Sequence, residues 1–252
     1  MPSRPAQSPV SPFFLALVAI TVGGGWLCAN KTGLLLTVGV VLLVLGGWAV
    51  SLCLHEFGHA VVAYRGGDLA VAEKGYLTLD IRRYADLGLS LVLPLVFLIL
   101  GAVPLPGGAV WINNWAIRSR PVRSLVSLAG PLINLVLGVL LALLTGVMTM
   151  PDGLRDGLSY LALVQLLAFV LNILPVPGLD GWGVLEPYLP KETREFGARV
   201  RPWAPLVLFL VLLGLPKASS IFFGAGLGLL WLSHGDPSGA LYGYSQFMFW
   251  RN

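Results

Sequence analysis

Residues 34–63 read LLLTVGVVLLVLGGWAVSLCLHEFGHAVVA, an apolar run interrupted near its end by three ionisable side chains. As an α-helix these residues measure about 45 Å, and about 20 apolar residues are enough to cross the hydrocarbon core of a bilayer. The sequence therefore predicts a membrane-spanning helix over 34–63. That helix carries His55, Glu56 and His59 in its last third.

The composition of the whole chain agrees with a membrane protein. Of its 252 residues, 56% are hydrophobic and 11% are charged, against about 25% charged in an average soluble domain. Mean hydropathy is +0.82. These values exclude a soluble globular enzyme and a disordered protein. The net charge of +4 does not indicate nucleic acid as a partner, because the basic residues flank apolar segments, where such charge sets membrane topology.

Five apolar runs are long enough to span a bilayer. They are residues 12–29, 34–63, 122–150, 157–176 and 204–232. A sixth run, 87–105, contains Pro94, and we expect it to enter and leave the membrane on one side as a re-entrant hairpin. The alternative is that 87–105 forms a sixth span, for which it is long enough.

The predicted fold is an all-α polytopic membrane protein with about five transmembrane helices. Residues 71–84 alternate in polarity, which predicts a short β-hairpin at the membrane surface. Residues 1–11 are rich in Pro and Ser and are expected to be disordered. We expect one membrane-embedded domain over 12–232 and a short tail over 233–252.

The three ionisable residues of the first run form the motif His55-Glu56-Phe57-Gly58-His59. Residues i and i+4 of a helix share one face, so both imidazoles can reach a single metal ion. Glu56 is turned away from His55 by about 100°, which leaves it able to take a proton from water. The alternative is a pair of buried histidines bonded to backbone carbonyls. It would leave Glu56 without a role in an apolar run, where an ionisable group is costly.

A catalytic zinc site needs a third protein ligand and an open position for water. His234 follows the last apolar run and is typical of an interfacial loop. Asp180 is the better candidate, because it follows an apolar helix that breaks at Pro175 and Pro177. Broken backbone at membrane depth is tolerated where it lines a cavity enclosed by protein. The alternative is a solvated Asp180 in an ordinary exit turn.

Three blocks of this sequence resemble the site-2 protease family of intramembrane zinc metalloproteases. They are HEFGH at 55–59, GPLIN at 130–134 and NILPVPGLDG at 172–181. The resemblance implies that His55, His59 and Asp180 bind one Zn²⁺ ion and that Glu56 is the catalytic acid and base. Further residues of the blocks would support the site or hold the substrate strand: Asn134, Asn172, Gly130, Pro131, Pro175 and Pro177. For the two asparagines, a role in helix packing is an equal alternative.

The resemblance implies that the substrate is a transmembrane helix of another protein, cleaved within the lipid bilayer as in regulated intramembrane proteolysis. Such a substrate, once extended, can add as a strand to an exposed edge, and the 71–84 hairpin is the candidate edge. Three other classes stay open. They are a membrane zinc metalloprotease of quality control or prenyl-protein processing, a zinc transporter, and a non-catalytic zinc-binding protein. Transporters tend to have paired half-repeats, which this sequence lacks. The sequence specifies no oligomeric state.

Topology predicts on which side the site lies. The histidines lie toward the end of one span and Asp180 follows the end of another, and these ends share a side only if 87–105 does not cross. In that arrangement, 12 of the 16 Lys and Arg residues lie on the side of the site and 3 on the other. By the positive-inside rule, that side is the cytoplasm. We therefore expect an integral protein of a bacterial cell membrane, with its site toward the cytoplasmic face.

Overall fold

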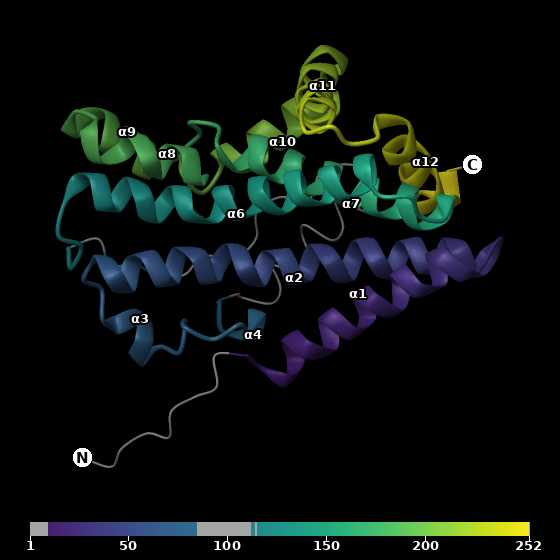
Figure 1. Ribbon diagram of the computed structural model, residues 1–252. Coiled ribbons are helices and arrows are strands. Elements are labelled where there is room, and N and C mark those ends of the chain that lie inside the picture. The colour runs from purple at the N-terminus through teal and green to yellow at the C-terminus, as the bar shows by residue number, and fades with distance from the viewer. Residues whose placement is uncertain (1–9, 85–111, 114, 252) are drawn as a thin grey trace.

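The computed structural model describes residues 10–84, 112–113 and 115–251. All the regular elements in these ranges are helices. The longer ones are α1 (Pro12–Asn30), α2 (Leu34–Gly66), α6 (Arg120–Val147), α7 (Asp152–Asn172), α9 (Lys191–Val200), α10 (Ala204–Gly214), α11 (Pro216–Leu232) and α12 (Pro237–Phe247). The short ones are α3 (Ala70–Glu73), α4 (Ile81–Tyr84), α8 (Asp180–Leu185), η2 (Glu186–Tyr188) and η3 (Phe249–Arg251). Figure 1 shows their arrangement.

Four helices are long and apolar enough to cross a membrane: α1, α2, α6 and α7. They confirm four of the five predicted spans. A fifth span arises only if α9 and α10, which are bent by 67° to one another, count as a single crossing. The chain is thus an integral membrane protein with four or five candidate spans among its described residues.

The fifth predicted span, 204–232, is wrong as a single helix. The structure divides it into α10 and α11, and Leu215 between them is extended, with φ −113° and ψ 103°. The residue after it, Pro216, explains the break, because proline disfavours helical backbone at the residue that precedes it. Pro216 then occupies the first position of α11, where its missing N–H leaves no carbonyl unpaired.

The β-hairpin predicted for 71–84 is also wrong, because this segment holds the end of α3, a turn and α4. Gly75 has a positive φ of 74°, which turns the chain after α3. The Asp80 carboxylate then accepts a hydrogen bond from the backbone N–H of Arg82 (3.2 Å). A side-chain bond of this kind favours a helical turn over a strand. What remains of strand pairing is one parallel bridge between Leu79 and Val10.

The end of α2 lies beside the start of α6. The backbone N–H of Arg118 donates to the carbonyl of Gly66 (3.1 Å), and the buried Asp68 carboxylate accepts from the backbone N–H of Asn113 (2.7 Å). The chain between α2 and α6 therefore leaves and returns at one end of the bundle. This is what a re-entrant hairpin requires, although 87–105 itself lies outside the described residues.

Helix α2 lies between α1 and α6 (Figure 1), and α7 packs against both α2 and α6. Close approach of α1 to α2 depends on glycine, because a Cβ on Gly24 would lie 2.8 Å from the carbonyl oxygen of Gly39. Helix α7 is the most buried of the four spans, with 67% of its most apolar window buried, against 17% for α1. The protein core therefore lies around α7, and α1 has most of its surface free for lipid.

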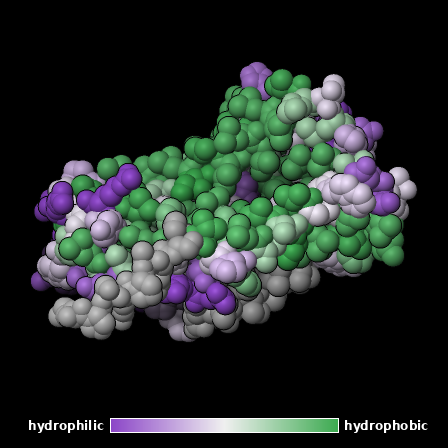
Figure 2. Space-filling model, turned by 60° about the horizontal axis from the view of Figure 1, so that its bottom comes forward, coloured by the Kyte–Doolittle hydropathy of each residue, from purple (hydrophilic) through white to green (hydrophobic). Residues whose placement is uncertain are grey.

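The segment expected to be a short tail belongs to this core. Residues 237–247 form α12, which packs along α7, and Phe247 is buried against Tyr160. On the face drawn in Figure 2, apolar residues cover most of the middle and most hydrophilic residues lie toward the ends. Such a surface is typical of a bundle whose middle contacts lipid.

Candidate metal centre

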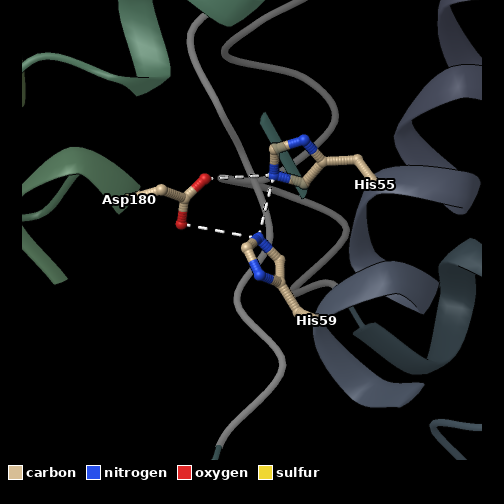
Figure 3. A group of neighbouring side chains, drawn as sticks. All are labelled: His55, His59 and Asp180. Atoms are coloured by element: carbon tan, nitrogen blue, oxygen red, sulfur yellow. Dashed lines mark hydrogen bonds and ion pairs between the residues drawn. The ribbon is translucent and has the colours of Figure 1, made fainter. Parts of the chain in front are cut away.

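The two histidines of α2 meet Asp180 in the interior of the bundle (Figure 3). The Nε2 atoms of His55 and His59 lie 3.1 Å apart. One carboxylate oxygen of Asp180 lies 3.2 Å from Nε2 of His55, and the other lies 3.4 Å from Nε2 of His59. Both histidines are buried, and Asp180 is a quarter exposed. These three side chains are the metal donors that the sequence analysis proposed, and the structure brings them together.

Asp180 reaches the histidines because the chain turns back sharply after α7. Pro175 and Pro177 lie in the connecting turn, and Gly178 has a φ of +102°, which favours glycine. Gly181 then passes so close to the carbonyl of Ile173, at the end of α7, that a Cβ would collide with it. The turn therefore fixes Asp180 as the first residue of α8.

Positive neighbours keep Asp180 ionised. Burial by itself would raise the pKa of this carboxyl, but the imidazole charges and hydrogen bonds of His59 and His55 outweigh burial and lower the pKa. A carboxylate that is deprotonated at neutral pH is the form that binds a metal.

Hydrogen bonds from the far side of each imidazole orient both rings. Nδ1–H of His55 donates to Oδ1 of Asn134 (2.5 Å), and Nδ1–H of His59 donates to the backbone carbonyl of Val126 (2.6 Å). When the ring is neutral, as metal binding requires, each bond places its single proton on Nδ1 and leaves Nε2 free for the ion. Metal-binding histidines are held by partners of this kind, which fix the tautomer and raise the basicity of the ligand nitrogen.

Helix α6 approaches the histidines closely because of Gly130. A Cβ at this position would collide with Nε2 of both His59 and His55. Pro131 follows inside the helix and is buried, and its missing N–H leaves the carbonyl of Ser127 without its helical donor. The carbonyl of the preceding residue, Val126, accepts from His59. The GPLIN block thus supplies close approach and one histidine partner, Asn134.

The donor set fits a zinc ion. In a tetrahedral site with zinc–ligand bonds of about 2.0–2.1 Å, neighbouring ligand atoms are about 3.3 Å apart. The two Nε2 atoms are 3.1 Å apart, and each lies within 3.4 Å of one of the two Asp180 oxygens, so the separations are close to that value. Among the described residues these side chains form a three-donor group able to hold a metal ion. Three protein donors leave one tetrahedral position for water or substrate.

Glu56 is buried in α2 next to His55 and outside the three-donor group. This placement suits a residue that exchanges protons near the metal rather than one that binds it.

The structure also describes Asn172 and His234, which the sequence analysis considered. Asn172 is the last residue of α7, is buried, and has no hydrogen-bond partner for Oδ1 within the described part of the chain. His234 follows α11 and has a positive φ of 57°. It is outside the three-donor group.

Sequence reasoning missed two partners of the site, Val126 and Gln165. Val126 acts through its backbone carbonyl, which no side-chain pattern reveals. Gln165 accepts a hydrogen bond from Nδ2 of Asn134 (2.9 Å). Its signal in the sequence is an amide in the middle of the apolar run 157–176, which in a membrane helix marks a polar interaction within the bundle.

The chain is similar to bacterial proteins named as zinc metalloproteases. A Mycobacterium tuberculosis protein named "Putative zinc metalloprotease Rip2" is 47% identical over 228 residues, covering 88% of this chain and 87% of the relative. The Mycolicibacterium smegmatis protein of that name is 45% identical over 227 residues, or 87% of each chain. YwhC of Bacillus subtilis, also named a zinc metalloprotease, is 31% identical over 183 residues, covering 69% of this chain and 81% of YwhC. No protein-family model and no solved structure matches the chain.

The donor set predicts how zinc content responds to substitution. We expect about one zinc ion per purified chain. His55→Ala, His59→Ala and Asp180→Ala should each lose most of it, since two donors do not hold the ion. Glu56→Gln should keep it, because Glu56 lies outside the donor group. Elemental analysis of detergent-purified variants measures this, and full zinc occupancy in Asp180→Ala would contradict the assignment of the third ligand.

Gly130 gives a second prediction. Gly130→Ala should lower zinc occupancy to a small fraction of wild type, because its methyl group takes the space of the two Nε2 atoms. Gly228→Ala is the matched control, since a Cβ there meets nothing within 4 Å. Zinc content and thermal unfolding of both variants provide the measurement. Equal occupancy in the two variants would show that α6 can yield at Gly130.

Proposed function

Because the chain belongs to the site-2 protease family of zinc metalloproteases, we propose that it cleaves a transmembrane segment of another membrane protein. The observation that carries this proposal is the position of the donors. His55 and His59 lie inside α2, a 33-residue span, and both are buried. A membrane zinc metalloprotease built in this way receives its substrate from the apolar phase more readily than from water.

Different residues of the site have different roles in the proposed hydrolysis. His55, His59 and Asp180 hold the zinc ion, which acidifies water and polarises the scissile carbonyl when bound. Glu56 takes the proton of the attacking water and delivers it to the nitrogen of the leaving amine. Asn134 and Val126 hold the two imidazoles in place.

A helical substrate must unwind before it reacts, because its peptide bonds are engaged in its own i to i−4 hydrogen bonds. An unwound strand then needs new partners in a dry site. The buried Oδ1 of Asn172, which has no partner in the described part of the chain, is an acceptor for such a strand. Asn172 directly precedes Ile173, whose carbonyl packs against Gly181 beside Asp180.

We further propose that the site faces the cytoplasm. Basic residues gather at the end of the bundle where α2 ends and α6 begins, and Arg65, Arg118 and Arg120 lie there. Four more basic residues lie after α8, in the segment 191–201 that contains α9. An excess of Lys and Arg marks the cytoplasmic side of bacterial membrane proteins.

The substrate proposal predicts a dependence on helix stability. A single-span substrate with Gly or Pro near its cytoplasmic end should be cut faster than the same helix with Leu there. These residues weaken a helix by about 1 kcal/mol (Gly) and about 3 kcal/mol (Pro) relative to Ala. Purified enzyme in detergent, assayed with matched substrates by gel and mass spectrometry, gives the rates.

Glu56→Gln is the control in the same assay, and it should bind zinc but cut about 10²–10⁴-fold more slowly. Equal rates for the Leu and Gly helices would remove unwinding as the limiting step. Faster cleavage of soluble unfolded proteins than of either helix would favour a quality-control protease instead.

Sidedness has its own measurement. Asp152→Cys and Glu192→Cys place thiols at two exposed positions. Residue 152 lies at the start of α7 and residue 192 lies beyond its end, so the proposed topology places them on opposite sides of the membrane. In intact cells, a membrane-impermeant thiol reagent should label residue 152 and should label residue 192 only after permeabilisation. The native Cys28 and Cys53 are buried and act as an internal blank. Labelling of residue 192 from outside would place the site at the outer face.

A further inference from the structure

We propose that Gln165 is a positioning residue of the zinc centre, because it fixes the orientation of Asn134 and thereby the nitrogen that His55 presents to the metal. The proposal rests on consecutive contacts that join the α7 side chain to the ligand. Neither the motifs of the sequence nor the names of the relatives assign Gln165 a role.

The contacts form an unbroken chain across three helices. Nδ1–H of His55 donates to Oδ1 of Asn134 (2.5 Å), and Nδ2–H of Asn134 donates to Oε1 of Gln165 (2.9 Å). The exposed fractions of the three residues are 4%, 5% and 1%. Water therefore does not compete for these bonds, and each group depends on the next for its partner.

Zinc binding sets the direction of every bond in this chain. Nε2 of His55 must carry no proton to bind the ion, so the ring proton is on Nδ1. That proton needs an acceptor, which Asn134 supplies by turning its oxygen toward His55. The amide nitrogen of Asn134 then points at α7, where it needs an acceptor in turn.

With its own Oε1 facing Asn134, Gln165 favours this orientation of Asn134 over the flipped one. With Oε1 opposite, the Asn134 amide gains a hydrogen bond only when its nitrogen faces α7. A flipped Asn134 would present N–H groups to Nδ1 of His55, and the ring proton would move to Nε2, where it blocks the metal. Because an amide has nearly the same shape in both orientations, packing alone does not choose between them.

The amide nitrogen of Gln165 also indicates that the residue has a specific role. Its Nε2 is buried without a hydrogen-bond partner in the described part of the chain. A buried donor left in this way is destabilising, and an apolar residue at 165 would avoid the penalty. The contact from Oε1 to Asn134 is the interaction that an apolar residue could not replace.

The test measures zinc affinity, so it is independent of which substrate the enzyme cuts. Gln165→Met keeps the volume and removes the acceptor, and we expect its zinc affinity to fall about tenfold, the lower end of the effect of outer partners of a ligand. Gln165→Glu keeps a carbonyl acceptor in its protonated form and should stay within about threefold of wild type. Ser159→Ala, which alters another buried polar residue of α7, is the matched control and should match wild type.

A second background separates positioning from general damage. Asn134→Asp keeps an acceptor for His55 but has no amide to orient, so adding Gln165→Met to it should change zinc affinity by less than about twofold. Chelator competition in detergent gives the affinities, and the visible spectrum of the Co²⁺ form reports the ligand geometry. Thermal unfolding of the metal-free forms shows which variants fold. Should Gln165→Met not fold, Gln165→Asn retracts the acceptor and carries the same expectations.

Two results would overturn the proposal. One is wild-type zinc affinity in Gln165→Met with an unchanged Co²⁺ spectrum. The other is an equal loss of affinity whether Gln165→Met is made in the wild-type chain or in the Asn134→Asp variant, which would mean that residue 165 does not act through Asn134. Neither outcome touches the proposed proteolysis, which depends on Glu56 and is measured by cleavage.

Discussion

The contact of α6 with the two histidines of α2 is the constraint on which the metal centre depends. At Gly130 the helix lies where a methyl group would displace both Nε2 atoms, and about one turn to either side it supplies the acceptors Val126 and Asn134. Imidazoles in an apolar bundle need such partners, because an unpaired polar group there costs several kcal/mol. Close approach and hydrogen bonding are thus one requirement, and the small residue and the two acceptors meet it together.

The second half of the site comes from α7 and the turn that follows it. As the most buried span, α7 is fixed by α2 and α6 on one side and by α12 on another. Just beyond its last residue, the carbonyl of Ile173 packs against Gly181, which places Asp180 opposite the histidines. The C-terminal helix α12 contributes none of the donors, yet by packing on α7 it helps to fix where the third ligand lies.

The sequence was sufficient where structure is decided locally. Long apolar runs determined α1, α2, α6 and α7, since spanning a bilayer depends on length and composition. The i, i+4 histidines had to share a face, whereas the broken helix made Asp180 only a candidate, and the family resemblance indicated it as the third ligand. The sequence was insufficient where a single residue or a tertiary contact determined the local structure. Pro216 divided 204–232, Asp80 began a helical turn in place of a strand, and α12 became part of the core by packing on α7. Val126 and Gln165 were missed because partners of ligands are chosen by the packing of α6 and α7.

The two kinds of ligand differ in how firmly they are held. The histidines are enclosed by two spans and tied from behind. Asp180 is a quarter exposed and lies on the six-residue helix α8, which follows a turn with two prolines. Among the described residues, Asp180 is therefore the least enclosed of the three donors, since its side chain is 25% exposed against 5% and 8% for His55 and His59. The histidines are held from behind by α6, whereas the position of Asp180 depends on the turn that follows α7.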